Sequence, residues 1–171
     1  MADKPKQQNK QEPQQSVFLK AMITGFFGGI LWSGVGAVAY YFNFTELTAA
    51  SFMFRSFLQT EWTGTWLAEI LAILLVGLLS LLIAILYYIL LKNKNGIWPG
   101  LFFGLSLWGI IFFVLRPIFP AIPSFLELNS DTWVTSGCLF ILYGVFIGYS
   151  ISYEYREFND AANSYSKEGG V

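Results

Sequence analysis

The sequence predicts an all-α membrane protein, an antiparallel bundle of four transmembrane helices with a short outer interfacial helix. The first reason is the presence of four long stretches without a charged residue, Ala21–Thr45, Ile70–Leu91, Asn95–Leu115 and Thr132–Tyr153. Each is long enough to cross the hydrocarbon core of a bilayer as a helix, which takes about 20 apolar residues. The second reason is that charged residues make up only 12% of the chain, against about 25% in soluble domains.

The 171 residues are expected to form one membrane domain, residues 17–158, between two tails. Residues 1–16 and 159–171 are polar, and such segments bury too little apolar surface to offset the entropy of ordering. We therefore expect both tails to be disordered, with one to two helical turns past Tyr153 before the second tail. The spans are placed at about residues 17–43, 67–91, 97–116 and 132–153.

The segment 45–62, which follows the first span, is too short and too polar to cross the membrane. Thr45 can cap a helix whose apolar residues recur at helical spacing, namely Leu47, Ala50, Phe54, Phe57 and Leu58. This pattern predicts a short helix lying on the outer membrane surface. Its role is left open among an anchoring loop, a cap over a cavity and a surface that binds a partner.

The second and third spans are joined by the tight turn Lys92–Gly96, which predicts an antiparallel hairpin. Pro117, Pro120 and Pro123 end the third span, because proline cannot continue a helix. Residues 124–127 match a capping box that can start one helical turn. Asp131 is then expected to cap the fourth span, where the helix dipole favours a negative charge.

The distribution of basic residues predicts that both chain ends face the cytoplasm. With the N-terminus inside, the outer side carries only Arg55 and Arg116. The inner side carries eight basic residues: Lys4, Lys6, Lys10, Lys20, Lys92, Lys94, Arg156 and Lys167. Cytoplasmic loops of membrane proteins are enriched in lysine and arginine, so the sequence indicates a multi-pass protein with N- and C-termini inside.

Small residues recur in steps of four in every span, which keeps them on one face of each helix. The main candidates for close helix packing are Gly25, Gly29, Ser33 and Ala37, then Gly96, Gly100 and Gly104, and finally Gly144 and Gly148. Small residues let helix backbones approach each other in lipid. Two interpretations stay open, packing within the bundle and contact of one such face, above all that of the first span, with another protein.

Glu69 and Arg116 are predicted to lie at similar depth near the outer membrane edge. Counted along each helix from the turn that joins the two spans, Glu69 lies about 35 Å from Lys92 and Arg116 about 33 Å from Lys94. The hypothesis is an interhelical ion pair between the two side chains, and the alternative is that each reaches separately to lipid headgroups.

The residue inventory excludes several classes of site. The chain has no histidine and one cysteine, Cys138, so an internal disulfide, a Cys/His zinc site and a histidine-based catalytic triad are all excluded. Polar side chains deep in the spans are uncharged, which argues against a proton relay. We predict no catalytic, cofactor-binding or metal-binding residue, and a net charge of −1 gives no general attraction for nucleic acid.

Four features together form a recognisable pattern: a Gln/Lys-rich N-terminal tail and the segments GFFGGILWSGVGAVAYYFNFTE, KNKNGIWPG and FVLRPIFPAIP. With these features the chain resembles the YqhR-type membrane proteins of Bacillus and related Firmicutes. The resemblance covers nearly the whole chain. It implies an uncharacterised multi-pass protein of the bacterial plasma membrane, and it supplies no reaction or binding residues to carry over.

The functional prediction is a non-catalytic scaffold or regulatory component that binds another membrane protein. The alternative is a small transporter or channel subunit with a pore lined by Gly, Ser and Tyr. A lipid-modifying enzyme comes third, with Glu69, Arg116 and Asp131 as its candidate polar groups. The expected partners are the lipid bilayer and another membrane protein or a second copy of the chain.

Overall fold

The computed structural model describes residues 14–56, 64–94, 96–118 and 128–168. Four helices in it are long and apolar enough to cross a membrane, Val17–Tyr41, Trp66–Leu91, Trp98–Leu115 and Ser130–Asp160. These described residues contain no strand. The predicted class, an all-α protein with four membrane-spanning helices, is confirmed. The expectations for residues 1–13, for Phe57 and Leu58 and for the capping box at 124–127 lie outside the described residues.

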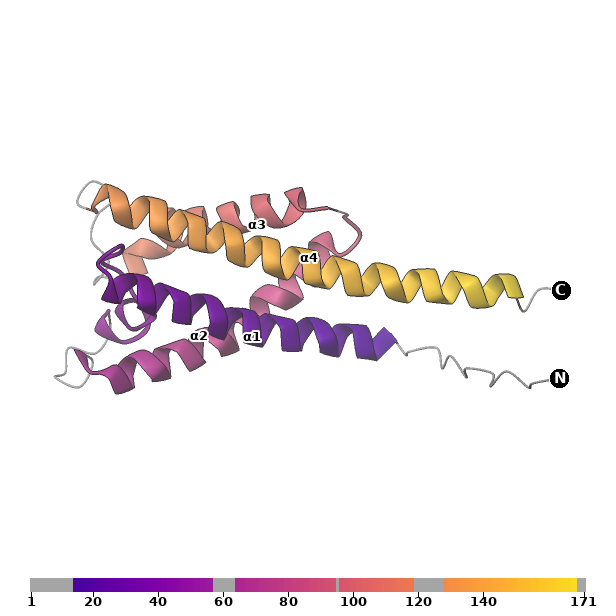
Figure 1. Ribbon diagram of the computed structural model, residues 1–171, viewed down its shortest axis with the longest axis horizontal. Helices are drawn as coiled ribbons and strands as arrows, with labels where there is room; N and C mark the ends of the chain where they lie inside the picture. Colours follow the sequence, from indigo (N-terminus) through magenta and orange to yellow (C-terminus); the bar gives the residue numbers. More distant parts are fainter. Residues whose placement is uncertain (1–13, 57–63, 95, 119–127, 169–171) are drawn as a thin grey trace, which may run out of the picture.

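The helices follow one another as an up-and-down bundle (Figure 1). Their bounds are α1 Gln14–Tyr41, η1 Ser51–Arg55, α2 Trp66–Leu91, α3 Trp98–Gly109, η3 Ile110–Leu115, η4 Arg116–Ile118 and α4 Ser130–Glu168. Helix α1 begins and helix α4 ends at the same end of the bundle, which we call the tail end. The opposite end, which contains η1 and η4, is called the loop end.

The helices pack as two pairs, α1 with α2 and α3 with α4, and the pairs are joined mainly where α1 packs on α4. Helices α2 and α3 are antiparallel, but they diverge from their turn (Figure 1) and do not pack along their lengths as a hairpin would. Near the turn they meet through Tyr87 and Phe103, whose ring centres are 5.0 Å apart at an interplanar angle of 83°. The tight turn between α2 and α3 therefore does not make them a packed pair.

Small residues account for the pairing. A Cβ atom added at Gly25 would come within 2.5 Å of the Ala84 Cβ, and one added at Gly29 within 2.5 Å of the Ser80 Cβ. These distances mean that the α1 and α2 backbones already lie as close as side chains allow. Because lipid provides no hydrophobic drive between helices, such close approach is a main source of packing energy.

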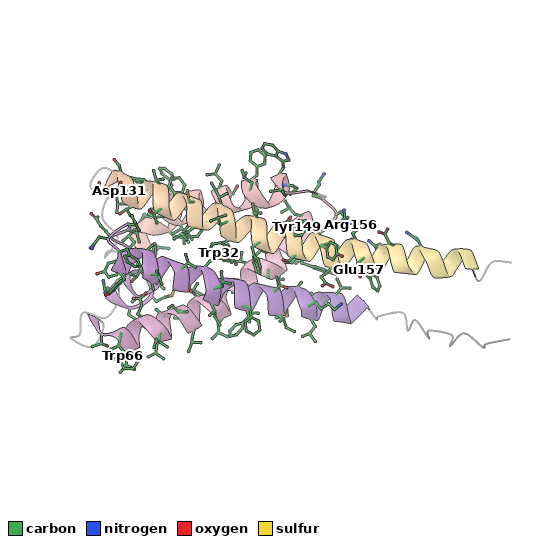
Figure 2. The ribbon with its side chains drawn as sticks, viewed as in Figure 1. Trp32, Trp66, Asp131, Tyr149, Arg156 and Glu157 are labelled. Atoms are coloured by element: carbon green, nitrogen blue, oxygen red, sulfur yellow. The ribbon has the colours of Figure 1, made fainter. Side chains whose placement is uncertain are left out.

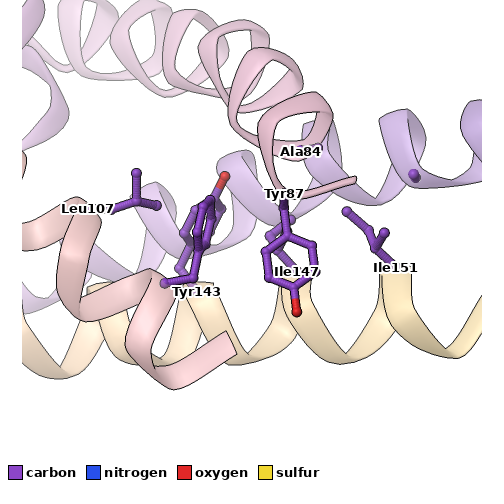
Figure 3. Close-up of a cluster of buried hydrophobic side chains, with 8 residues drawn as sticks. Ala84, Tyr87, Leu107, Tyr143, Ile147 and Ile151 are labelled. Carbon is purple, nitrogen blue, oxygen red and sulfur yellow. The ribbon is translucent and has the colours of Figure 1, made fainter. Parts of the chain in front are cut away.

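The centre of the bundle is filled by a cluster of buried side chains shown in Figure 3. It includes Tyr87, Tyr143, Ile147 and Ile151. The Ser80 hydroxyl donates to the Gly25 carbonyl at 2.6 Å and lies 2.5 Å from the Tyr143 hydroxyl. Since the single Ser80 proton goes to the carbonyl, Tyr143 is the donor in the second bond. This chain of hydrogen bonds links α1, α2 and α4.

The C-terminal part of α4 differs from the expectation of a disordered tail after residue 158. Helix α4 continues to Glu168 and projects beyond the start of α1 (Figure 1). Residues 154–168 contain no glycine or proline, the residues that most strongly interrupt helices. At the other end, Gln14–Ser16 belong to α1 rather than to a tail.

The segment between α1 and α2 contains a short helix, as expected, but its described part begins later than Thr45. The described helical part is short, with the π-helical turn η1 at Ser51–Arg55. The cap is Thr48 rather than Thr45, because the Ser51 N–H lies 3.3 Å from the Thr48 hydroxyl oxygen and the Thr48 N–H lies 3.3 Å from that of Ser51. Thr45 instead accepts the Leu47 N–H at 3.2 Å, which forms a local turn. Leu47 packs with Phe112 and Leu128 in a second buried cluster.

Candidate functional site: an acidic cavity at the loop end

A cavity of about 790 Å³ lies at the loop end, between the ends of α1, α2 and α4 and the turn η1. This volume falls within the range of about 300–1,000 Å³ found for small-ligand sites. Figure 2 shows two of its residues, Trp66 at the start of α2 and Asp131 at the start of α4, at this end of the bundle. The other lining residues are Ala37, Tyr40, Tyr41, Asn43, Thr45, Glu46, Arg55, Gly64, Thr65, Glu69, Asn129 and Thr132.

Negative charge predominates on the cavity wall. Three carboxylates, Glu46, Glu69 and Asp131, line it together with one guanidinium, that of Arg55. The Arg55 guanidinium carbon lies 5.9 Å from the centre of the Tyr40 ring, a distance typical of a cation–π contact. The wall therefore combines a net negative charge with aromatic rings, a combination suited to positively charged groups.

Glu69 is the least exposed of these carboxylates. It lies in the first turn of α2, where the helix dipole stabilises a negative charge. Its Oε1 atom is buried and has no hydrogen-bond partner among the described residues. A buried polar atom without a partner lowers stability by roughly 1–3 kcal/mol. A ligand that donates a hydrogen bond to this oxygen would offset that cost.

The segment that carries Glu46 is fixed to α4 by a long-range hydrogen bond. The Glu46 N–H donates to the Thr132 Oγ1 at 3.0 Å. Thr132 is only 1% exposed, so this contact is shielded from solvent and lipid. Asp131 lies beside it in the first turn of α4, one residue inside the helix rather than at the predicted cap position. The bond thus holds the backbone at Glu46 against the start of α4, which also carries Asp131.

The structure leaves the predicted pair of Glu69 and Arg116 as a prediction. The side chain of Arg116 lies outside the part of the chain that the structure describes, and its turn η4 does not pack against α2. What the structure adds is the set of residues around Glu69, including Glu46, Arg55 and Tyr40, which sequence reasoning did not connect to it. One hint of this cavity was visible in the sequence. The outer segment 45–62 carries charged residues, and a cap over a cavity was one of the roles left open for it.

The ion pair has a direct test in a double-mutant cycle. If Glu69 and Arg116 are paired, Glu69→Ala lowers the melting temperature in detergent, and Arg116→Ala in that background adds little more. The reason is that the first substitution already removes the interaction. Melting followed by tryptophan fluorescence measures both effects, and two full, additive losses would contradict the pair.

The small residues predicted for helix packing fall into four environments. Gly25, Gly29, Gly100, Gly104, Gly144 and Gly148 all lie where an added Cβ would meet a neighbouring helix. Gly96 lies in the turn before α3 with φ +101°, a conformation that favours glycine. The Ser33 hydroxyl donates to the Gly29 carbonyl of its own helix at 2.6 Å. Ala37 lines the cavity.

The described residues contain no cluster of three or more Asp, Glu, Cys or His side chains that could hold a metal ion. Cys138 lies on α4, is exposed and lines neither this cavity nor the smaller one described below. The carboxylates are spread over the wall, where they suit an extended ligand or a basic side chain.

Fold and site together define a four-span helical membrane protein with an acidic, aromatic cavity at one end of its bundle. Comparison with known proteins gives the family. Residues 2–166 match the family described as conserved membrane protein YqhR, and the chain belongs to this family. It is 44% identical over 150 residues to the uncharacterized protein YqhR of Bacillus subtilis strain 168, covering 88% of this chain and 84% of that relative. No solved structure matches the chain.

Proposed function

We propose that this protein is a non-catalytic scaffold or regulatory component of the bacterial cell membrane that binds another membrane protein. The observation that carries the proposal is the acidic, aromatic cavity at the loop end. With the termini in the cytoplasm, as the lysine and arginine distribution favours, this cavity opens on the outer side. The partner presents a lysine or arginine side chain to it.

The cavity supplies both parts of a site for a basic side chain. Tyr40, Tyr41 and Trp66 offer aromatic rings that attract a cation, and Glu69 offers a carboxylate oxygen without a hydrogen-bond partner among the described residues. An interfacial charge pair in a partly buried site fixes the register of two partners. Tyr41 is 81% exposed, so a partner can reach the rim without rearranging the bundle.

The filled centre of the bundle favours this role over the alternative of a transporter or channel subunit. Between the cavity and the tail end lies the buried cluster that contains Tyr143 and Ile147. The polar groups there bond to each other, as Ser80 does with Tyr143. A path for ions would have to displace these side chains, whereas binding at the loop end leaves them in place.

Photocrosslinking from the rim of the cavity tests the proposal. A benzophenone amino acid in place of Tyr41 is expected to crosslink one defined membrane protein in intact cells. The matched control replaces Trp98, which is 69% exposed at the opposite end. Glu69→Gln and, separately, Glu46→Gln in the Tyr41 background are expected to reduce the crosslink at least fivefold, because each removes a charge from the wall.

Two features keep this experiment decisive. Glu157→Gln removes the same charge from the exposed surface of α4 near the tail end and is expected to leave the crosslink unchanged (Figure 2). Melting temperature and elution volume show whether each variant is folded. The same products from the Trp98 position, or a crosslink insensitive to both glutamate substitutions in folded protein, would refute the proposal.

A further inference from the structure

A second, smaller cavity of about 390 Å³ lies at the tail end, where α2 ends and α3 begins. Its wall is formed by Leu91, by Lys94 in the turn, and by one face of α3 with Trp98, Phe102, Phe103 and Ser106. The α3 residues follow one another at helical spacing, so the cavity is a groove along that helix. It is unrelated to the acidic cavity at the loop end.

The groove runs from the membrane surface into the hydrocarbon region. The step from Trp98 to Ser106 corresponds to about 12 Å of helix. Trp98 and Phe102 are 69% and 58% exposed, and their ring centres lie 6.1 Å apart in a stacked arrangement. The Ser106 hydroxyl donates to the Phe102 carbonyl at 2.7 Å, so it needs no partner from a ligand. The wall therefore presents an apolar surface to whatever fills it.

A single cation lies at the mouth of the groove. The Lys94 N–H donates to the Leu91 carbonyl at 2.8 Å, and this turn places Lys94 past the end of α2 with its side chain exposed. The neighbouring Lys92 instead contacts aromatic rings, since its ammonium lies 4.5 Å and 4.8 Å from the ring centres of Tyr88 and Tyr155. The groove lining contains no acidic residue to neutralise Lys94.

We propose that this groove binds one anionic phospholipid, with an acyl chain along Trp98, Phe102 and Ser106 and the phosphate at Lys94. An apolar groove open to the bilayer is filled by acyl chains, because lipid is the solvent there. The exposed Lys94 makes the groove prefer an anionic headgroup over a neutral one, since basic side chains at the membrane surface attract anionic lipids. The tryptophan lies at headgroup level, where indole rings are favoured.

Native mass spectrometry of the full chain, released from detergent with equal amounts of dioleoyl phosphatidylglycerol and dioleoyl phosphatidylcholine, tests the site. We expect the phosphatidylglycerol adduct to exceed the phosphatidylcholine adduct by about fivefold, the scale of one lysine near an anionic surface. Lys94→Gln is expected to bring the ratio close to one. Ser106→Trp is expected to reduce both adducts at least threefold, because it fills the groove without altering its charge.

The matched control is Arg156→Gln, which removes one positive charge from the exposed surface of α4 near the tail end but outside the groove. It is expected to keep the fivefold preference. Equal adducts of the two lipids on the unaltered chain would overturn the proposal. So would an equal loss from Lys94→Gln and Arg156→Gln, which would indicate general surface charge, or unchanged adducts in folded Ser106→Trp.

Discussion

Replacing Gly144 with alanine is expected to lower the free energy of unfolding in detergent by about 1–3 kcal/mol, the usual range for overpacking a tight site. The added Cβ would lie 2.5 Å from the Gly100 carbonyl oxygen and 2.5 Å from the backbone nitrogen and Cα of Gly104. All three are main-chain atoms of α3, which cannot rotate away as the end of a side chain can. The α3–α4 pair must therefore separate to admit one methyl group.

Gly34→Ala is the matched control, because no atom of a neighbouring element lies within 4 Å of a Cβ added there. Alanine is intrinsically a better helix former than glycine by about 1 kcal/mol, so this variant is expected to keep or gain stability. Thermal melting by tryptophan fluorescence and the fraction that elutes as a single folded species give the comparison. Equal stability of the two alanine variants would contradict the close contact of α3 and α4.

The four spans were predictable from the sequence because crossing a bilayer is a one-dimensional constraint. Charge-free length is visible along the chain, and the helices Val17–Tyr41 and Trp66–Leu91 lie close to the spans expected at 17–43 and 67–91. Helix pairing depends instead on which two helices bring their small-residue faces into contact. The candidate glycines were visible, but the faces of Gly25 and Gly144 could each have met several neighbours, and the tight turn wrongly favoured pairing α2 with α3.

The cavity was less predictable, because it joins residues that are far apart in the chain. Glu46 and Thr132 are 86 residues apart and are joined by a backbone-to-side-chain hydrogen bond that no local pattern indicates. Helical spacing predicted that residues after Thr45 form a helix, but not that the segment before η1 would be attached to the start of α4. Glu69 was visible as an isolated charge near a span end, while its neighbours on the cavity wall depend on this attachment.

Replacing Ser80 with alanine is expected to destabilise the folded protein by roughly 1–3 kcal/mol, the usual cost of leaving a buried polar group without a partner. The substitution affects two buried hydrogen bonds at once, because it removes the donor to the Gly25 carbonyl and leaves the Tyr143 hydroxyl without its acceptor. Ser80 is 1% exposed and Tyr143 is 7% exposed, so water cannot replace the lost partners easily. Such orphaned groups cost more than the net value of a hydrogen bond.

A double-mutant cycle separates the contribution of the Ser80–Tyr143 hydrogen bond from the other effects of the two substitutions. Tyr143→Phe in the Ser80→Ala background removes the orphaned hydroxyl, so the double variant is expected to recover about 0.5–1.5 kcal/mol of the sum of the single losses, within the range measured between membrane helices. Ser106→Ala is the control, since that exposed serine bonds only within its own helix. Strict additivity of the two changes, or an equal loss from Ser106→Ala, would mean that this hydrogen bond does not hold α2 to α4. The α2–α4 contact would then depend on packing alone.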